Sequence, residues 1–180
     1  SRLWFEGINE PNLWAGEPAG LVAAYYAEFT VACHGFGLHV VTCNFGVSQP
    51  TNFGKIDYPP DWKPFEPIRQ VMWPDDYVGL HLYFGLGGVN DPTWLWHSGC
   101  YLFCPWRDVK IMATECGMDN GVNQKHKQSW HQLPGDFDVK TQTYLGMLRA
   151  HEERMQRDGR FEAAFVFTDD YGSNDWEFFS

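Results

Sequence analysis

The prediction of the fold starts from the segment LWFEGINEPN, residues 3–12, an apolar run that ends in an amide and a carboxylate. Its apolar residues are typical of a strand buried on both faces, and Pro11 cannot continue a hydrogen-bonded ladder. Asn9 and Glu10 should therefore stand at the C-terminal end of this strand. Parallel α/β barrels carry their active sites at that end of the strands.

A second segment, VKIMATECG at residues 109–117, has the same pattern, because a mostly apolar run stops at Glu115 just before a glycine. We expect this segment to be a strand that ends at Glu115. Two strands would then each deliver one carboxylate. Two carboxyl groups that face each other across a cleft are the minimum set of catalytic groups for glycoside hydrolysis, one as acid/base and one as nucleophile.

The combination of Asn9-Glu10-Pro11 with Glu115 roughly a hundred residues later resembles a large clan of retaining glycosidases built on the (β/α)8, or TIM, barrel. In that clan the fourth strand ends in Asn-Glu-Pro and the seventh ends in the nucleophilic Glu. The resemblance implies an α/β fold, here a partial TIM barrel with strands four to eight. It makes residues 1–180 the C-terminal portion of a single catalytic domain.

A chain of 180 residues can form one domain with a sizeable core, whereas a complete TIM barrel typically needs about 250. We therefore expect a fragment, a processed piece or one part of a split structure, with strands one to three missing. Part of a barrel exposes unpaired strand edges and apolar interior. Association with the missing N-terminal portion or with a second copy is the expected consequence.

The rest of the chain alternates helical and strand patterns, as parallel strands joined by crossover connections require. Apolar residues at three- and four-residue spacing predict helices over 18–34, 64–72 and 139–157. Runs rich in β-branched and aromatic residues predict further strands over 38–45, 77–84 and 161–168. The Gly/Asn/Gln/His-rich segment 117–138 should be a long loop at the catalytic mouth.

The resemblance also implies roles for the polar residues at the strand ends. Glu10 would be the general acid/base, with a pKa raised by partial burial and by the charge of Glu115. Asn9 would hydrogen-bond the 2-hydroxyl of the sugar, and Glu115 would attack the anomeric carbon as a carboxylate. No cofactor is implied.

His81 and Tyr83 lie in the strand predicted over 77–84 and point to the same side, because side chains alternate along a strand. In the glycosidase clan this strand commonly carries a His or Tyr that contacts the nucleophile or the sugar. We expect Tyr83 to donate the hydrogen bond that keeps Glu115 ionised. A histidine packed in the core with a backbone partner is the alternative for His81.

Three tryptophans in the predicted loops, Trp14, Trp130 and Trp176, are candidates for stacking on sugar rings. For Trp14, packing against a neighbouring loop is equally compatible with a side chain of this size. His126 and His131 raise the question of a metal. No cysteine or carboxylate stands at ligand spacing from them, and Lys125 and Lys127 add positive charge, so no metal site is predicted.

The net charge of −10 argues against nucleic acid as a partner, because little here could neutralise a row of phosphates. No apolar run reaches the ~18 residues of a membrane span. Acidic surfaces are common on secreted hydrolases and elsewhere, so secretion is only slightly favoured. The five cysteines are expected to be buried free thiols, although Cys100 and Cys104 could pair.

The sequence thus predicts a retaining β-glycosidase that acts on a polysaccharide or oligosaccharide. Two alternatives remain at this stage. One is a catalytically silent barrel that keeps the fold and an aromatic, carbohydrate-binding cleft. The other is an incomplete fragment that is inactive without its N-terminal strands. The separation of the Glu10 and Glu115 carboxyl groups tests the first alternative, since a wide separation favours binding or an inverting enzyme.

Overall fold

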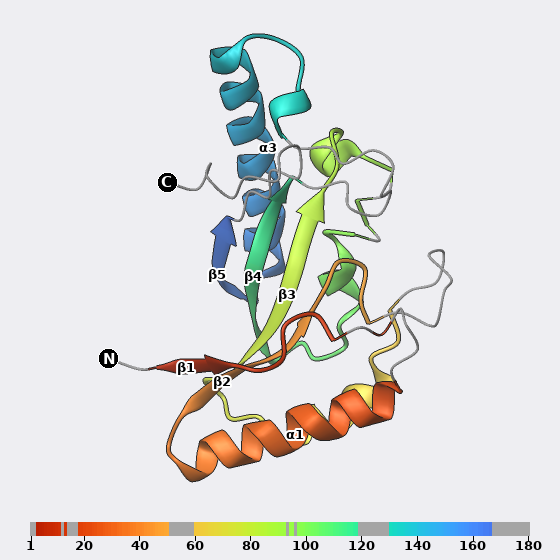
Figure 1. The fold of residues 1–180 in the computed structure, drawn as a ribbon, viewed down its shortest axis with the longest axis vertical. Helices are drawn as coiled ribbons and strands as arrows, with labels where there is room; N and C mark the ends of the chain where they lie inside the picture. Colours follow the sequence, from red (N-terminus) through yellow and green to blue (C-terminus); the bar gives the residue numbers. More distant parts are fainter. Residues whose placement is uncertain are drawn as a thin grey trace, which may run out of the picture.

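The computed structural model describes residues 3–11, 13, 18–50, 60–92, 94–95, 97–118 and 130–166. In these residues five parallel strands form one sheet in the order β1-β2-β3-β4-β5, so that neighbours in the sequence are neighbours in space. The sheet is curled into a half-barrel (Figure 1). The α/β class and the parallel order agree with the expectation from the sequence.

The strands are β1 (Trp4–Glu6), β2 (His39–Phe45), β3 (Tyr77–Phe84), β4 (Lys110–Met118) and β5 (Phe161–Val166). The α-helices are α1 (Ala19–Gly35), α2 (Glu66–Val71) and α3 (Phe137–Asp158). Short 3-10 turns are η2 (Lys63–Phe65), η3 (Gly88–Asn90), η4 (Cys100–Phe103) and η5 (Trp130–Gln132). All three predicted helices and the strands predicted over 38–45 and 77–84 are therefore present, with small changes at their ends. The strand predicted over 161–168 is present as far as Val166, and its last two residues lie outside the described residues.

The two long helices begin and end where their sequences indicate. Pro18 stands at the N-cap of α1, where its missing N–H is not needed. Asp136 caps α3 by accepting a hydrogen bond from the backbone N–H of Val139 at 3.0 Å, a contact typically worth about 1 kcal/mol. Gly159 ends α3 in the left-handed conformation, at φ 77°.

Two strand predictions are wrong in detail. The first strand was expected to be buried on both faces, but Leu3 and Phe5 are 65% and 44% exposed. Among the described residues β1 pairs with β2 alone, so it is an edge strand and its outer side is uncovered. The strand expected to stop at Glu115 continues to Met118, because its pairing with β3 continues as far as Phe84.

The hydrophobic core lies where β2, β3 and β4 meet the helices and the connection between β3 and β4. Its largest fully buried apolar side chains are Tyr26, Phe45, Phe65, Phe84, Ile68, Leu80, Leu82, Tyr101 and Ile111. All five cysteines are free and buried, as expected, and this includes Cys100 and Cys104. None of the helices in the described ranges has both the length and the apolar character needed to cross a membrane.

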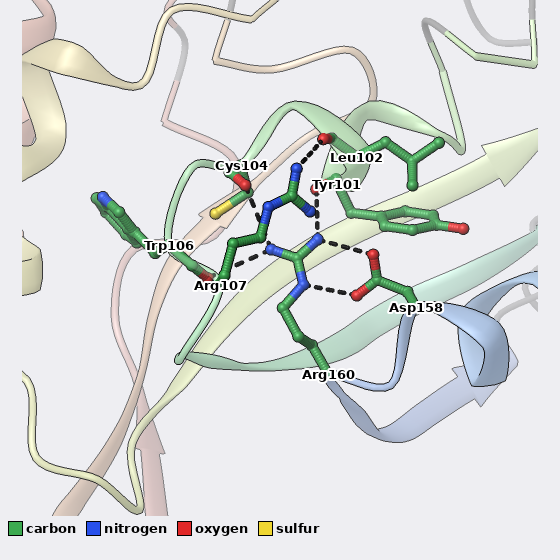
Figure 2. Close-up of polar contacts among 7 residues, drawn as sticks. All are labelled: Tyr101, Leu102, Cys104, Trp106, Arg107, Asp158 and Arg160. Carbon is green, nitrogen blue, oxygen red and sulfur yellow. Dashed lines mark hydrogen bonds and ion pairs between the residues drawn. The ribbon is translucent and has the colours of Figure 1, made fainter.

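Arg160, just before β5, joins the connection between β3 and β4 to the end of α3 (Figure 2). Its guanidinium makes two hydrogen bonds to Asp158, at 2.6 and 2.9 Å. Three more go to backbone carbonyls, those of Tyr101 at 2.9 Å and of Cys104 and Trp106 at 3.3 Å. Arginine has five N–H donors, so every donor of this buried side chain is used.

Candidate active site

Three side chains, from the C-terminal halves of β3 and β4 and from the segment after β1, meet at one site. His81 of β3 and Glu115 of β4 are paired in the register, and Glu10 follows β1. His81 Nδ1 lies 2.6 Å from Glu10 Oε1 and 3.3 Å from Glu115 Oε2. One imidazole nitrogen and one oxygen from each carboxylate all lie within 4.8 Å of one another. Two carboxylates from non-adjacent strands therefore share one site.

The backbone around Glu10 holds its side chain against β2. Glu10 has a φ of 45°, a left-handed conformation that non-glycine residues rarely adopt. Its N–H donates to the carbonyl of Asn44 at 3.1 Å, and Asn44 itself has a φ of 30°. Residues in such conformations cluster at functional sites. Local backbone strain thus accompanies the positioning of Glu10.

Gly46 provides the space that the Glu10 carboxylate occupies. A Cβ atom at Gly46 would lie 3.1 Å from Glu10 Oε1 and 3.2 Å from its carboxyl carbon, so a side chain there would press on this carboxylate. Neither Asn44 nor Gly46 was predicted from the sequence to be a site residue. The signal was present, because Asn44 and Gly46 stand at the end of the strand predicted over 38–45.

His81 is completely buried and is the central residue of the site. A carboxylate can only accept hydrogen bonds, so Nδ1 carries a hydrogen and donates it to Glu10. The other ring nitrogen, Nε2, is buried and has no hydrogen-bond partner among the described residues. The alternative of a core histidine held by a backbone partner does not describe this side chain, since its contacts are with the two carboxylates.

Tyr83 orients Glu115. The Tyr83 hydroxyl donates to Glu115 Oε2 at 2.7 Å, which is the hydrogen bond expected from the sequence. The backbone carbonyl of Tyr83 in turn accepts a hydrogen bond from the buried Ser98 hydroxyl. Ser98 was not singled out from the sequence, because it lies 15 residues away and no local pattern marks it.

The electrostatic expectation for Glu10 was wrong in sign. The hydrogen bond from His81 lowers the pKa of Glu10 below its ordinary value, and this outweighs the upward effect of partial burial. The Glu10 side chain is 50% exposed, so the upward effect of burial does not overcome the hydrogen bond from His81. Glu10 is thus held in its ionised form in the free site, whereas a general acid must carry a proton.

The site carries unbalanced negative charge. Among the described residues, the ion pairs of Glu10 and Glu115 are made with His81 only, and neither carboxylate contacts a lysine or arginine. Glu10 is half exposed and Glu115 is 25% exposed, while His81 has no exposed surface. The carboxylates therefore face solvent above a buried imidazole.

Asn9 and three tryptophans were the other residues predicted to contact sugar. Asn9 is exposed beside Glu10. Trp130 packs on α3, where its ring stacks on Tyr144 with centroids 6.0 Å apart, so that one ring face is already in contact with the protein. Trp14 and Trp176 lie outside the described residues, as does His126.

A cavity of about 460 Å³ lies between α3 and β5 and is separate from the two carboxylates. Leu148, Met155 and Ala163 contribute to its apolar wall. Cys116 lines it but the adjacent Glu115 does not, as expected if successive side chains of β4 face opposite sides of the sheet. This cavity therefore adds nothing to the carboxylate site.

No family model, curated protein or solved structure matches this chain. The chemistry that the site supports therefore follows from its own atoms. These are two solvent-facing carboxylates, a buried imidazole that donates to one of them, and a phenol that donates to the other.

Proposed function

We propose that this protein hydrolyses β-O-glycosidic bonds in a polysaccharide or oligosaccharide by a retaining, two-carboxylate mechanism. In this proposal the half-barrel is the C-terminal portion, strands four to eight, of a TIM-barrel glycosidase. The observation that supports it is the approach of Glu10 and Glu115, whose nearest oxygens lie within 4.8 Å. Retaining pairs stand about 5–5.5 Å apart, and inverting pairs about 6.5–9.5 Å.

In the first step Glu115 attacks the anomeric carbon while Glu10 protonates the departing glycosidic oxygen. The hydrogen bond from Tyr83 holds one oxygen of Glu115 in a fixed place, which leaves the other free to attack. In the second step Glu10 removes a proton from water, and this water releases the sugar from Glu115. Asn9, beside Glu10, would contact the 2-hydroxyl.

The lowered pKa of Glu10 gives this mechanism a pH preference. Glu10 must be protonated in the first step, and its protonated fraction grows as the pH falls toward its lowered pKa. The proposed enzyme should therefore become more active as the pH falls from neutral. His81 lowers the pKa and so restricts the acid step to that range.

A catalytically silent carbohydrate-binding barrel is the second candidate. The observation that favours it is the same hydrogen bond from His81, because a Glu10 that stays ionised can accept hydrogen bonds from sugar hydroxyls but cannot act as an acid. Hydrolysis distinguishes the two candidates, since both bind sugar and only one cleaves it.

We further propose that the sheet is closed by additional strands, either from an N-terminal portion or from a second copy. The exposed side chains of β1 and β5 support this, since Phe5 and Phe165 are 44% and 55% exposed on the two outer strands. Open edges and uncovered apolar surface favour association. Without such closure, residues 1–180 alone would be inactive.

The test is hydrolysis of aryl β-glycosides by the natural full-length protein and by its Glu115→Ala variant. We expect the variant to lose at least about a thousandfold in kcat, since removing a catalytic residue of a cooperating set costs this much or more. Azide, a small nucleophile that fits the space left by the carboxylate, should restore turnover. Glu162→Ala, which removes an exposed carboxylate of β5, is the matched control. Equal rates for the native protein and Glu115→Ala would refute the proposal.

A further inference from the structure

The carboxylate site combines three features that attract a cation. It has two carboxylates with no lysine or arginine paired to them in the described part of the chain. It has a buried imidazole whose Nδ1 points at both of them. Its half-exposed Glu10 leaves the site open to solvent. Histidine nitrogen and carboxylate oxygen are ordinary ligands of transition-metal ions.

We propose that Glu10, His81 and Glu115 form a binding site for a divalent transition-metal ion, with Zn²⁺ as the representative. Ligands about 2.1 Å from a tetrahedral ion stand about 3.4 Å from one another. The distance from His81 Nδ1 to Glu115 Oε2 is 3.3 Å, and the three ligand atoms lie within 4.8 Å of one another. Only the half-exposed Glu10 must move appreciably, since its oxygen is 2.6 Å from Nδ1.

The ligand set selects among metals. Mg²⁺ and Ca²⁺ prefer oxygen ligands alone, whereas an imidazole nitrogen suits Zn²⁺ and its neighbours in the first transition row. With one nitrogen and two carboxylate oxygens, the protein leaves a fourth position for water, as open zinc sites do. The site should therefore bind Zn²⁺ in the presence of a large excess of Mg²⁺.

The surroundings already orient two of the three ligands. Tyr83 fixes Glu115 by its 2.7 Å hydrogen bond, in the way that outer residues of metal sites hold their ligands. His81 is held by complete burial. When the ion binds, the hydrogen leaves Nδ1, since a ligating histidine nitrogen must be unprotonated, and the ion takes its place between the carboxylates.

Metal binding would block the reaction proposed above. An ion bound to Glu115 Oε2 withdraws electron density from the whole carboxylate and so weakens its other oxygen as the nucleophile, and an ion bound to Glu10 occupies the position of the acid proton. Inhibition by Zn²⁺, reversed by a chelator, is the expected result. This consequence rests on the proposed function, whereas the binding itself rests on the geometry alone.

Binding is measured on the natural full-length protein after removal of metals with a chelator. Zn²⁺ is titrated in competition with a fluorescent chelator, in the absence and presence of millimolar Mg²⁺. Co²⁺ is titrated separately, because its visible absorption reports ligand number. We expect one Zn²⁺ bound per chain with affinity unchanged by Mg²⁺, and a single saturating Co²⁺ spectrum. Absence of binding, or equal displacement by Mg²⁺, would overturn the proposal.

Variants locate the ion. Glu10→Gln, Glu115→Gln and His81→Asn each remove one ligand with little change of shape. Each should weaken Zn²⁺ binding at least about tenfold, since loss of an outer partner alone costs about 10–100-fold. The controls are Glu162→Gln and His39→Gln, which remove a carboxylate that faces Lys110 and a histidine that faces Asp76 and should leave the affinity unchanged.

If the three ligand variants bind Zn²⁺ as tightly as the native protein, the ion lies elsewhere and the proposal is wrong. Glu10→Gln changes a half-exposed side chain and should fold normally, so the result does not depend on the stability of a variant at the buried His81. Zn²⁺ binding without glycoside hydrolysis would refute the proposed function and support this site. Hydrolysis without Zn²⁺ binding would do the reverse.

Discussion

Two clusters of charged residues in this protein differ in how fully their hydrogen-bonding groups are used. In the first, all five N–H donors of Arg160 are hydrogen-bonded to Asp158 and to three backbone carbonyls (Figure 2). The side chains of Arg160 and Asp158 are only 7% and 6% exposed. In the second, Glu10 and Glu115 share one imidazole and stay partly exposed. The first cluster is complete within the described chain, and the second is open.

This difference separates a structural role from a chemical one. A complete cluster has no group left for a ligand, and breaking it leaves buried polar atoms without partners. An open cluster keeps charge that only water, a proton, a cation or a substrate can balance. Paired carboxylates in an open site are therefore candidates for chemistry, and Arg160 is a candidate for stability.

The largest expected effect is on stability, at the complete cluster. Arg160→Met should lower the free energy of unfolding by about 3–5 kcal/mol, because Asp158 is left as an uncompensated buried charge. Urea unfolding monitored by tryptophan fluorescence measures this. The aryl β-glycoside activity of the folded protein should be unchanged, because Arg160 contacts neither Glu10 nor Glu115.

The double variant Arg160→Met/Asp158→Leu sharpens this prediction. Removing both charges is often close to neutral, so the double variant should recover part of the loss. Recovery should be incomplete, because the carbonyls of Tyr101, Cys104 and Trp106 also lose their donor. If Arg160→Met alone lowers the free energy of unfolding by less than about 1 kcal/mol, this cluster does not stabilise the fold as proposed.

The next effect is on activity, at the open cluster. Tyr83→Phe removes the hydrogen bond to Glu115, and hydrogen bonds to charged groups are worth about 1.5–3 kcal/mol. We expect kcat/KM for aryl β-glycosides to fall roughly 10–100-fold, since 1.4 kcal/mol corresponds to a factor of ten. The melting temperature should change little. A variant that melts much lower but keeps full activity would assign Tyr83 to stability instead.

The third effect is a displacement of the pH profile. His81 lowers the pKa of Glu10, and the basic limb of kcat/KM reports the pKa of the group that must be protonated. His81→Leu removes the hydrogen bond, raises this pKa and should move the basic limb to higher pH. His81→Asn, whose amide can still donate to Glu10, is the matched control and should keep the limb near its native place. If the limb does not move in His81→Leu, Glu10 is not the acid.

The helices, the parallel order of the strands and the proximity of Glu10 to Glu115 could be predicted from the sequence. The helices follow from local periodicity, and the proximity follows because the C-terminal ends of parallel strands lie on the same side of the sheet. It was insufficient for the pKa of Glu10, which depends on a donor 71 residues away. The exposure of β1 was also unpredictable, because burial of a strand is decided by what covers its edge. The end of β4 could not be predicted for a similar reason, since pairing with β3 extends this strand beyond Glu115 to Met118.

The smallest expected effect comes from an ion pair that belongs to neither cluster. Arg157 and Glu153 stand four residues apart on α3, 3.5 Å from each other, and are 75% and 65% exposed. Arg157→Met should cost at most about 1 kcal/mol, since water screens such pairs and the helix terminus adds only a few tenths. Urea unfolding beside Arg160→Met measures it. Two arginines three residues apart would then differ severalfold in cost, and equal costs would mean that burial and saturation of the donors do not explain the role of Arg160.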